Sequence, residues 1–154
     1  MSIEFTAFLY RPRELHERIS DLAVDLIGSL AACTNTTAKY GATGGGSGGG
    51  GGDAKDGKLA VYADLKKRYV SVSHAYEDAA EAVIRFTAGL ENPRDAMIIR
   101  LRYAEIMDMP QILERLKREG HDITLRTLYN WHNDAVNRAE KLWLKKMKEE
   151  AEKQ

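Results

Sequence analysis

The sequence is poor in the residues that form cross-links and metal centres. Cys33 is the only cysteine among 154 residues, which excludes a disulfide within the chain and a metal cluster held by cysteines. The four histidines are scattered, and no two of them have the spacing of metal ligands on a helix. We therefore expect no metal ion and no other cofactor.

Long apolar runs and catalytic motifs are also missing. No stretch is long enough to span a bilayer, and the first residues lack the basic-then-apolar pattern of a signal peptide. The glycine run leads into Gly57-Lys58-Leu59, which lacks the Lys-Ser or Lys-Thr ending of a phosphate-binding loop. Nothing assembles a nucleophile, a base and an orienting group. We expect an intracellular protein, without membrane contact, that is not an enzyme.

Strand-like alternation of useful length is absent, so the expected fold class is all-α. Aromatic residues make up 8% of the chain, and a glycine tract divides it, which favours two helical parts over one large core. The predicted parts are an N-terminal helix (1–40), a flexible glycine-rich linker (41–57), a long heptad helix (58–91) and a helix-turn-helix domain (92–154). The linker permits a long antiparallel, coiled-coil-like hairpin, and its composition fits a natural or an engineered origin.

The helix over 58–91 carries an apolar seam with steps of three and four residues, which is a heptad pattern. Its members are Tyr62, Leu65, Tyr69, Val72, Tyr76, Ala79, Val83, Phe86 and Leu90. The N-terminal helix has a matching seam of Leu15, Ile19, Leu22, Leu26, Ser29 and Cys33, widened by Ala23, Ile27 and Leu30. Two helices alone bury little surface. Closure within one chain and sharing in a homodimer therefore both remain open.

Local signals divide 92–154 into three helices. Asn92-Pro93 is a cap followed by a first-turn proline. Asp108 and Gln111 have the spacing of a capping box, Gly120 fits a left-handed helix end, and Thr124 is the expected cap of the third helix. The predicted buried residues are Met97, Ile98, Leu101 and Ala104, then Ile112, Leu113 and Leu116, then Leu128, Trp131 or His132, Ala135, Ala139 and Leu142.

The third helix carries a row of polar residues on the side away from its predicted core. Arg126, Asn130, Asn133 and Asn137, hereafter the polar stripe, share one face of a helix. Arginine can bond guanine, and asparagine adenine, through two hydrogen bonds. The base-reading candidates are Arg126, Thr127, Asn130, Asn133 and Asn137, and the phosphate-binding candidates are Thr124, Arg138, Lys141, Lys145 and Lys148. Tyr129 is expected either to contact phosphates or bases or, equally, to pack against the first of the three helices. A plain solvated helix face is the alternative.

Charge is balanced globally but not locally. The chain has 23 basic and 23 acidic residues, so its net charge gives no general attraction to nucleic acid. The segment from Thr124 to Lys148, however, contains six basic and two acidic residues. We expect modest, salt-sensitive affinity for duplex DNA, confined to this helix.

Two runs in this region resemble region four of the bacterial sigma factors, as carried by small phage-encoded regulators of late genes of the RinA and ArpU types. The runs are IIRLRYAEIMDMPQILERLKREG and ITLRTLYNWHNDAVNRAEKL. The resemblance implies a DNA-binding transcriptional regulator in the cytoplasm of a bacterial host, with double-stranded DNA and RNA polymerase as partners. It places Arg126-Thr127-Leu128-Tyr129 at the start of the recognition helix. The turn from Lys117 to Thr124 is longer than the sigma-factor turn.

Two other functions fit the same pattern. A small terminase subunit for phage DNA packaging also combines a helix-turn-helix with coiled helices, and it would form a ring of many subunits. A helical interaction module without DNA binding would use its heptads and lysine-rich end on partner helices.

Overall fold

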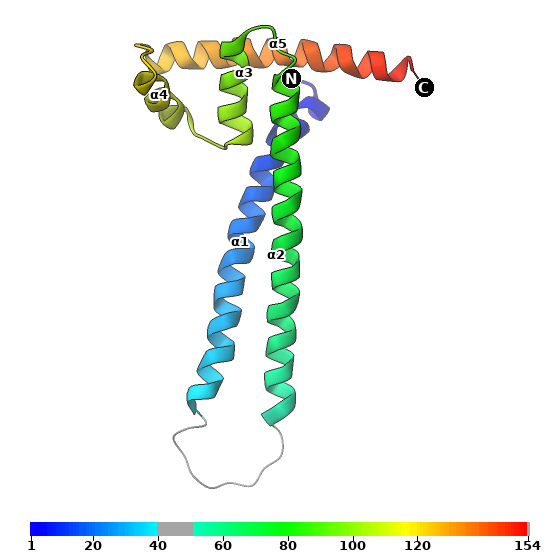
Figure 1. The fold of residues 1–154 in the computed structure, drawn as a ribbon, viewed down its shortest axis with the longest axis vertical. Helices are drawn as coiled ribbons and strands as arrows, with labels where there is room; N and C mark the ends of the chain where they lie inside the picture. Colours follow the sequence, from blue (N-terminus) through cyan, green and yellow to red (C-terminus); the bar gives the residue numbers. More distant parts are fainter. Residues whose placement is uncertain (40–50, 154) are drawn as a thin grey trace. The chain divides into compact units, whose positions relative to one another are not determined.

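The protein is all-helical in the part of the chain that the structure describes. The computed structural model describes the backbone of residues 1–39 and 51–153, and the side chains of 1–34 and 56–153. Its elements are α1 (Ile3–Lys39), α2 (Gly51–Thr87), α3 (Pro93–Ile99), the π-helical turn η1 (Arg100–Ala104), α4 (Met109–Arg118) and α5 (Leu125–Ala151) (Figure 1). None of these helices has the length and apolar character needed to cross a membrane. The predicted fold class is confirmed at this level.

The chain divides into two compact units. One consists of Met1–Glu14 and Tyr76–Gln154, and the other of Leu15–Ala75. The predicted linker 41–57 lies partly outside the described residues. Its last seven residues, 51–57, form the first two turns of α2 instead of coil. The sequence from Gly52 to Gly57 contains no proline to stop a helix, so α2 starts earlier than its glycine content suggested.

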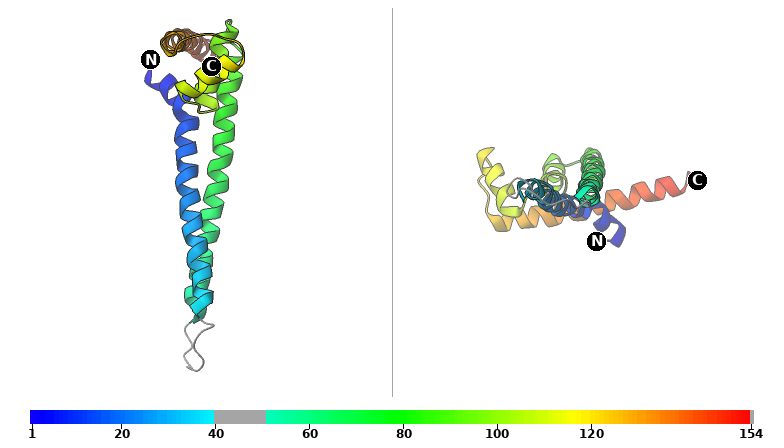
Figure 2. Two further views of the ribbon diagram at one scale, coloured as in Figure 1. Left: turned by 90° about the vertical axis from the view of Figure 1, so that its left-hand side faces the viewer. Right: turned by 90° about the horizontal axis from the view of Figure 1, so that it is seen from below.

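In the unit Leu15–Ala75, segments of α1 and α2 lie side by side and run in opposite directions (Figures 1 and 2). Open grooves of about 570 and 500 Å³ lie between them, and Leu22, Val72 and Val61 are among the lining residues. The widening of the α1 seam by Ile27 and Leu30 is not seen, because these side chains are 71% and 50% exposed. Two helices cover only the stripe that each turns toward the other, and these two positions lie beside it.

The unit formed by Met1–Glu14 and Tyr76–Gln154 has two buried clusters. The first joins five elements and consists of Phe5, Leu9, Val83, Phe86, Ile99, Tyr103, Ala104, Ala135, Val136 and Ala139. The second joins α3, η1, α4 and α5 and consists of Ile98, Leu101, Met109, Ile112, Leu116 and Leu128. Aromatic rings extend the first cluster, with Phe8 and Trp143 centroids 4.4 Å apart. Burial of these side chains fixes α5 against the rest of the unit.

The turn η1 explains why more residues are buried here than a regular helical pattern predicts. The Glu105 amide donates to the Arg100 carbonyl at 3.0 Å, five residues back, so the helix is locally wider than an α-helix. Ile99 and Tyr103 therefore point inward together with Ile98 and Leu101. The chain then turns at Ile106, which has a left-handed φ of 57°.

Candidate nucleic-acid interface

The caps predicted for the C-terminal helices are present. Asn92 accepts from the Arg94 amide at 3.0 Å at the start of α3. Asp108 and Gln111 form a complete capping box on α4, with both hydrogen bonds 2.8 Å long. Thr124 Oγ1 accepts from the Thr127 amide at 3.2 Å at the start of α5. These bonds satisfy amides that a helix leaves unpaired, so each start is fixed locally.

The connection between α4 and α5 is a defined six-residue turn. Gly120 has a φ of 91°, which suits glycine and strains other residues. The His121 amide donates to the Leu116 carbonyl at 3.0 Å, which closes the end of α4. The turn leads from the last residue of α4, Arg118, to Leu125 at the start of α5, and Figure 2 shows α4 beside the first turns of α5.

The polar stripe lies on the exposed side of α5. Leu128, Ala135 and Ala139 on the opposite side are fully buried. The four stripe residues are all exposed: Arg126, Asn130, Asn133 and Asn137. Trp131 and His132 are both half-buried, so the inward face uses both of the residues between which the sequence left a choice.

Thr124, Thr127 and Tyr129, which lie next to the polar stripe, differ in how free their side chains are to contact nucleic acid. Tyr129 is 47% exposed, so a large part of its side chain is accessible to solvent. Thr124 and Thr127 bond each other through their hydroxyl oxygens at 2.9 Å, in addition to the cap. Their hydroxyls thus already serve the start of α5.

Arg138, a phosphate candidate, is paired with a buried carboxylate. Its Nη2 donates to Asp95 Oδ1 at 3.1 Å, and its Nε donates to Asp95 Oδ2. This hydrogen bonding raises the pKa of the Arg138 guanidinium. Asp95 lies on α3 and is 1% exposed, whereas the Arg138 side chain is 46% exposed. Arg138 therefore joins α3 to α5 and still reaches the surface.

A pocket lined by cations lies next to this pair. It has a volume of about 460 Å³ and is formed by Gly89–Asn92, Asp95, Arg138, Lys141, Leu142 and Lys145. We call it the basic pocket. Lys141, Lys145 and Lys148 are exposed, as expected of phosphate candidates, and Lys145 Nζ lies 3.9 Å from a Glu149 oxygen.

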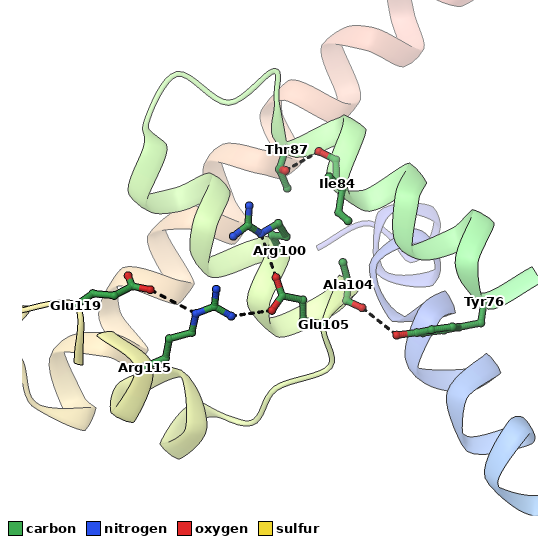
Figure 3. Close-up of polar contacts among 8 residues, drawn as sticks. All are labelled: Tyr76, Ile84, Thr87, Arg100, Ala104, Glu105, Arg115 and Glu119. Carbon is green, nitrogen blue, oxygen red and sulfur yellow. Dashed lines mark hydrogen bonds and ion pairs between the residues drawn. The ribbon is translucent and has the colours of Figure 1, made fainter. Parts of the chain in front are cut away.

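Ion pairs attach α4 to the helix before it (Figure 3). Glu105 lies between Arg100 and Arg115, at 3.2 Å from Arg100 Nε and 2.9 Å from Arg115 Nη1. Arg115 Nε is 3.4 Å from Glu119. The side chains are partly exposed, so each pair adds little stability, but a connected set restrains α4. The Tyr76 hydroxyl, also in Figure 3, donates to the Ala104 carbonyl at 3.4 Å and joins α2 to η1.

A buried polar pair supports the inner side of α5. Tyr103 Oη and His132 Nε2 are 3.1 Å apart. Burial lowers the pKa of His132 and raises that of Tyr103, and the nearby Tyr10 also raises the Tyr103 value. Both groups are therefore held neutral around pH 7.

Two residues that position α5 were missed in the sequence. Asp95 resembles an ordinary first-turn acid, and nothing local points to a partner 43 residues away. Arg94 lies over the Trp131 ring, 4.6 Å from its centroid, which is a second contact between α3 and α5. The only available signal was the placement of charged residues directly after the Asn92 cap.

Comparisons of the chain with protein-family models, curated proteins and solved structures found no match.

Proposed function

We propose that the protein is a sequence-specific, double-stranded DNA-binding transcriptional regulator, of the kind that phages use for late genes. The observation that carries this proposal is the polar stripe: one arginine and three asparagines, all exposed, on the side of α5 opposite its buried side chains. Such residues are the common bidentate readers of guanine and adenine. The phage assignment and a contact with RNA polymerase are supported by the sequence resemblance.

In this proposal α4, the six-residue turn and α5 act as a helix-turn-helix. The first turns of α5, with Arg126 and Asn130, enter the major groove, where an α-helix fits. The lysines at positions 141, 145 and 148 come later along α5 and contact the phosphate backbone. The capped ends and the ion pairs of Arg115 reduce the conformational freedom that binding would otherwise have to remove.

We also propose that the helices of the unit Leu15–Ala75 join two copies of the chain. The exposed Ile27 and Leu30 and the open grooves between α1 and α2 support this. A dimer would present two α5 helices to a split DNA site. Light scattering tests the stoichiometry. A ring of many subunits would favour a small terminase subunit instead.

Selection from a random duplex library tests the DNA-binding proposal. The intact protein is compared with the double variant Arg126→Ala, Asn130→Ala across a salt series. Arg85→Ala serves as the control, because it removes the same charge from an exposed side chain on α2 outside the unit Leu15–Ala75. We expect the intact protein and the control to enrich one discrete sequence that the double variant does not enrich. Absence of enrichment, or equal enrichment by the double variant, would contradict the proposal.

A further inference from the structure

The basic pocket gathers three cations on one side of α5. Arg138, Lys141 and Lys145 project toward an open cavity of about 460 Å³. The opposite wall is the turn between α2 and α3. Two acids also line the cavity, but Asp95 is already paired with Arg138. The lining residues therefore carry one positive charge in excess, and Lys141 follows Asn137 of the polar stripe by one helical turn. Lys145 also has a long contact, 3.9 Å, with the exposed Glu149.

Arg138 is held in a fixed orientation at this pocket. Asp95 occupies its Nε–H and one N–H of Nη2. A guanidinium has five N–H donors, so the Nη1 amino group and the second N–H of Nη2 remain for another acceptor. Since Asp95 already restrains the planar group, a phosphate that binds it removes less side-chain freedom than with a mobile arginine. Asp95 thus acts as a positioning residue for Arg138.

The far wall of the pocket lies close to α5. A Cβ atom on Gly89 would be 3.3 Å from Leu142 Cδ2 and 3.2 Å from Lys146 Nζ, both tighter than ordinary contacts. Lys146 itself lies 5.4 Å from the centroid of the Phe86 ring. Because the turn and the helix already touch at Gly89, the width of the pocket is set by the packing of the protein.

We infer that the basic pocket binds a phosphodiester group of the duplex backbone, at the flank of the polar stripe. This inference rests on the proposed function and deepens it. Arg138 supplies a fixed pair of donors, whereas Lys141 and Lys145 supply mobile ammonium groups. Phosphate contacts carry no sequence information, but they fix the register of a helix on the duplex. The pocket therefore decides which base pairs lie in front of the asparagines.

The test uses the full chain with the double variant Lys141→Gln, Lys145→Gln. The control, Arg11→Gln, Arg85→Gln, removes the same charge from exposed side chains of α1 and α2 that lie outside both the basic pocket and the unit Leu15–Ala75. Affinity for the selected duplex and for a scrambled duplex is measured from low to high salt. Loss of one phosphate contact should reduce the slope of log affinity against log salt concentration by about 0.9. The ratio of the affinities of the intact protein and the variant should then change about eightfold between about 0.1 M and 1 M salt. The loss should be equal for both duplexes.

A second arm distinguishes backbone phosphate from a free anion. Inorganic phosphate is titrated against the intact protein and the pocket variant, and the lysine signals are followed by NMR. Binding of inorganic phosphate that depends on the two lysines, with an unchanged salt slope for DNA, would overturn the inference. An unchanged slope without phosphate binding would also overturn it, while leaving selection by the polar stripe intact. Failure of every protein to bind duplex DNA would instead overturn the proposed function together with the pocket.

Discussion

Asp95 of α3 and Arg138 of α5 form a two-point ion pair across 43 residues of sequence, with the carboxylate buried and the guanidinium at the surface. Such a pair fixes an orientation more than it adds net stability, because burial of the carboxylate has its own cost. The asymmetry in burial means that removal of the two partners should have different consequences.

Removal of Arg138 alone should destabilise the protein, since it leaves the buried Asp95 carboxylate with only the longer contact to Arg94, at 3.5 Å. We expect Arg138→Ala to melt at a lower temperature than the double variant Asp95→Asn, Arg138→Gln, which removes both charges of the pair. Thermal unfolding followed by circular dichroism ranks the two against the intact protein. A melting temperature of Arg138→Ala equal to that of the intact protein would show that the pair does not restrain α3 and α5.

Gly120→Ala should lower the free energy of unfolding by about 1–2 kcal/mol. The cost arises from the backbone alone: φ is 91°, and an added Cβ would meet no atom within 4 Å. Gly57→Ala is the matched control. Its Cβ also meets nothing within 4 Å, but Gly57 is helical, so this change should raise stability by about 0.4–1 kcal/mol. Urea unfolding measures both, and a similar sign for the two variants would contradict the expectation.

Acid should weaken the fold through His132. Its pKa is lowered in the folded state, mainly by burial, so the unfolded chain takes up a proton first as the pH falls below the ordinary value of 6.5. Stability is unaffected by this group above that pH and decreases below it until the folded state is protonated as well. Replacement by asparagine, which does not titrate, should flatten the decrease between about pH 6.5 and 5. Urea unfolding at several pH values measures this, with His121→Asn, an exposed site, as the control.

Single replacements in the later part of the polar stripe should change sequence preference with little change in stability. Asn133→Ala and Asn137→Ala remove exposed side chains that are not members of the buried clusters, and of the two only Asn133 has a side-chain hydrogen bond that affects the pKa of His132. Each should cost about 1–3 kcal/mol at one base position if that residue reads adenine. Binding to a set of single-base variants of the selected duplex measures the cost. A loss that is the same at every base position would identify the side chain as a backbone contact.

The helix starts were predictable because each depends on residues close together in sequence. Asn92, Asp108 and Thr124 cap helices whose amides lie two or three residues away. The polar stripe followed from helical spacing alone.

Contacts between residues that are far apart in the sequence could not be predicted from local sequence patterns. Asp95 and Arg138 each have an ordinary local explanation, as a first-turn acid and a surface cation. Likewise, η1 changes the helical repeat at Arg100–Ala104, so Ile99 and Tyr103 are buried although a regular repeat did not select them. A hydrogen bond over five residues instead of four leaves no mark in the composition.

The left-handed turn at Ile106 has a consequence for the rates at which parts of the chain open. A branched side chain in this conformation costs roughly 1–2 kcal/mol, and the turn is retained by an Arg102 bond to the Met107 carbonyl at 2.9 Å and by the Met107 amide bond to Leu101. When these bonds break, the strain is released. Opening of the segment between η1 and α4 is therefore favoured over opening of the capped helices beside it, and its amide hydrogens should exchange with solvent sooner than those within α4 and α5.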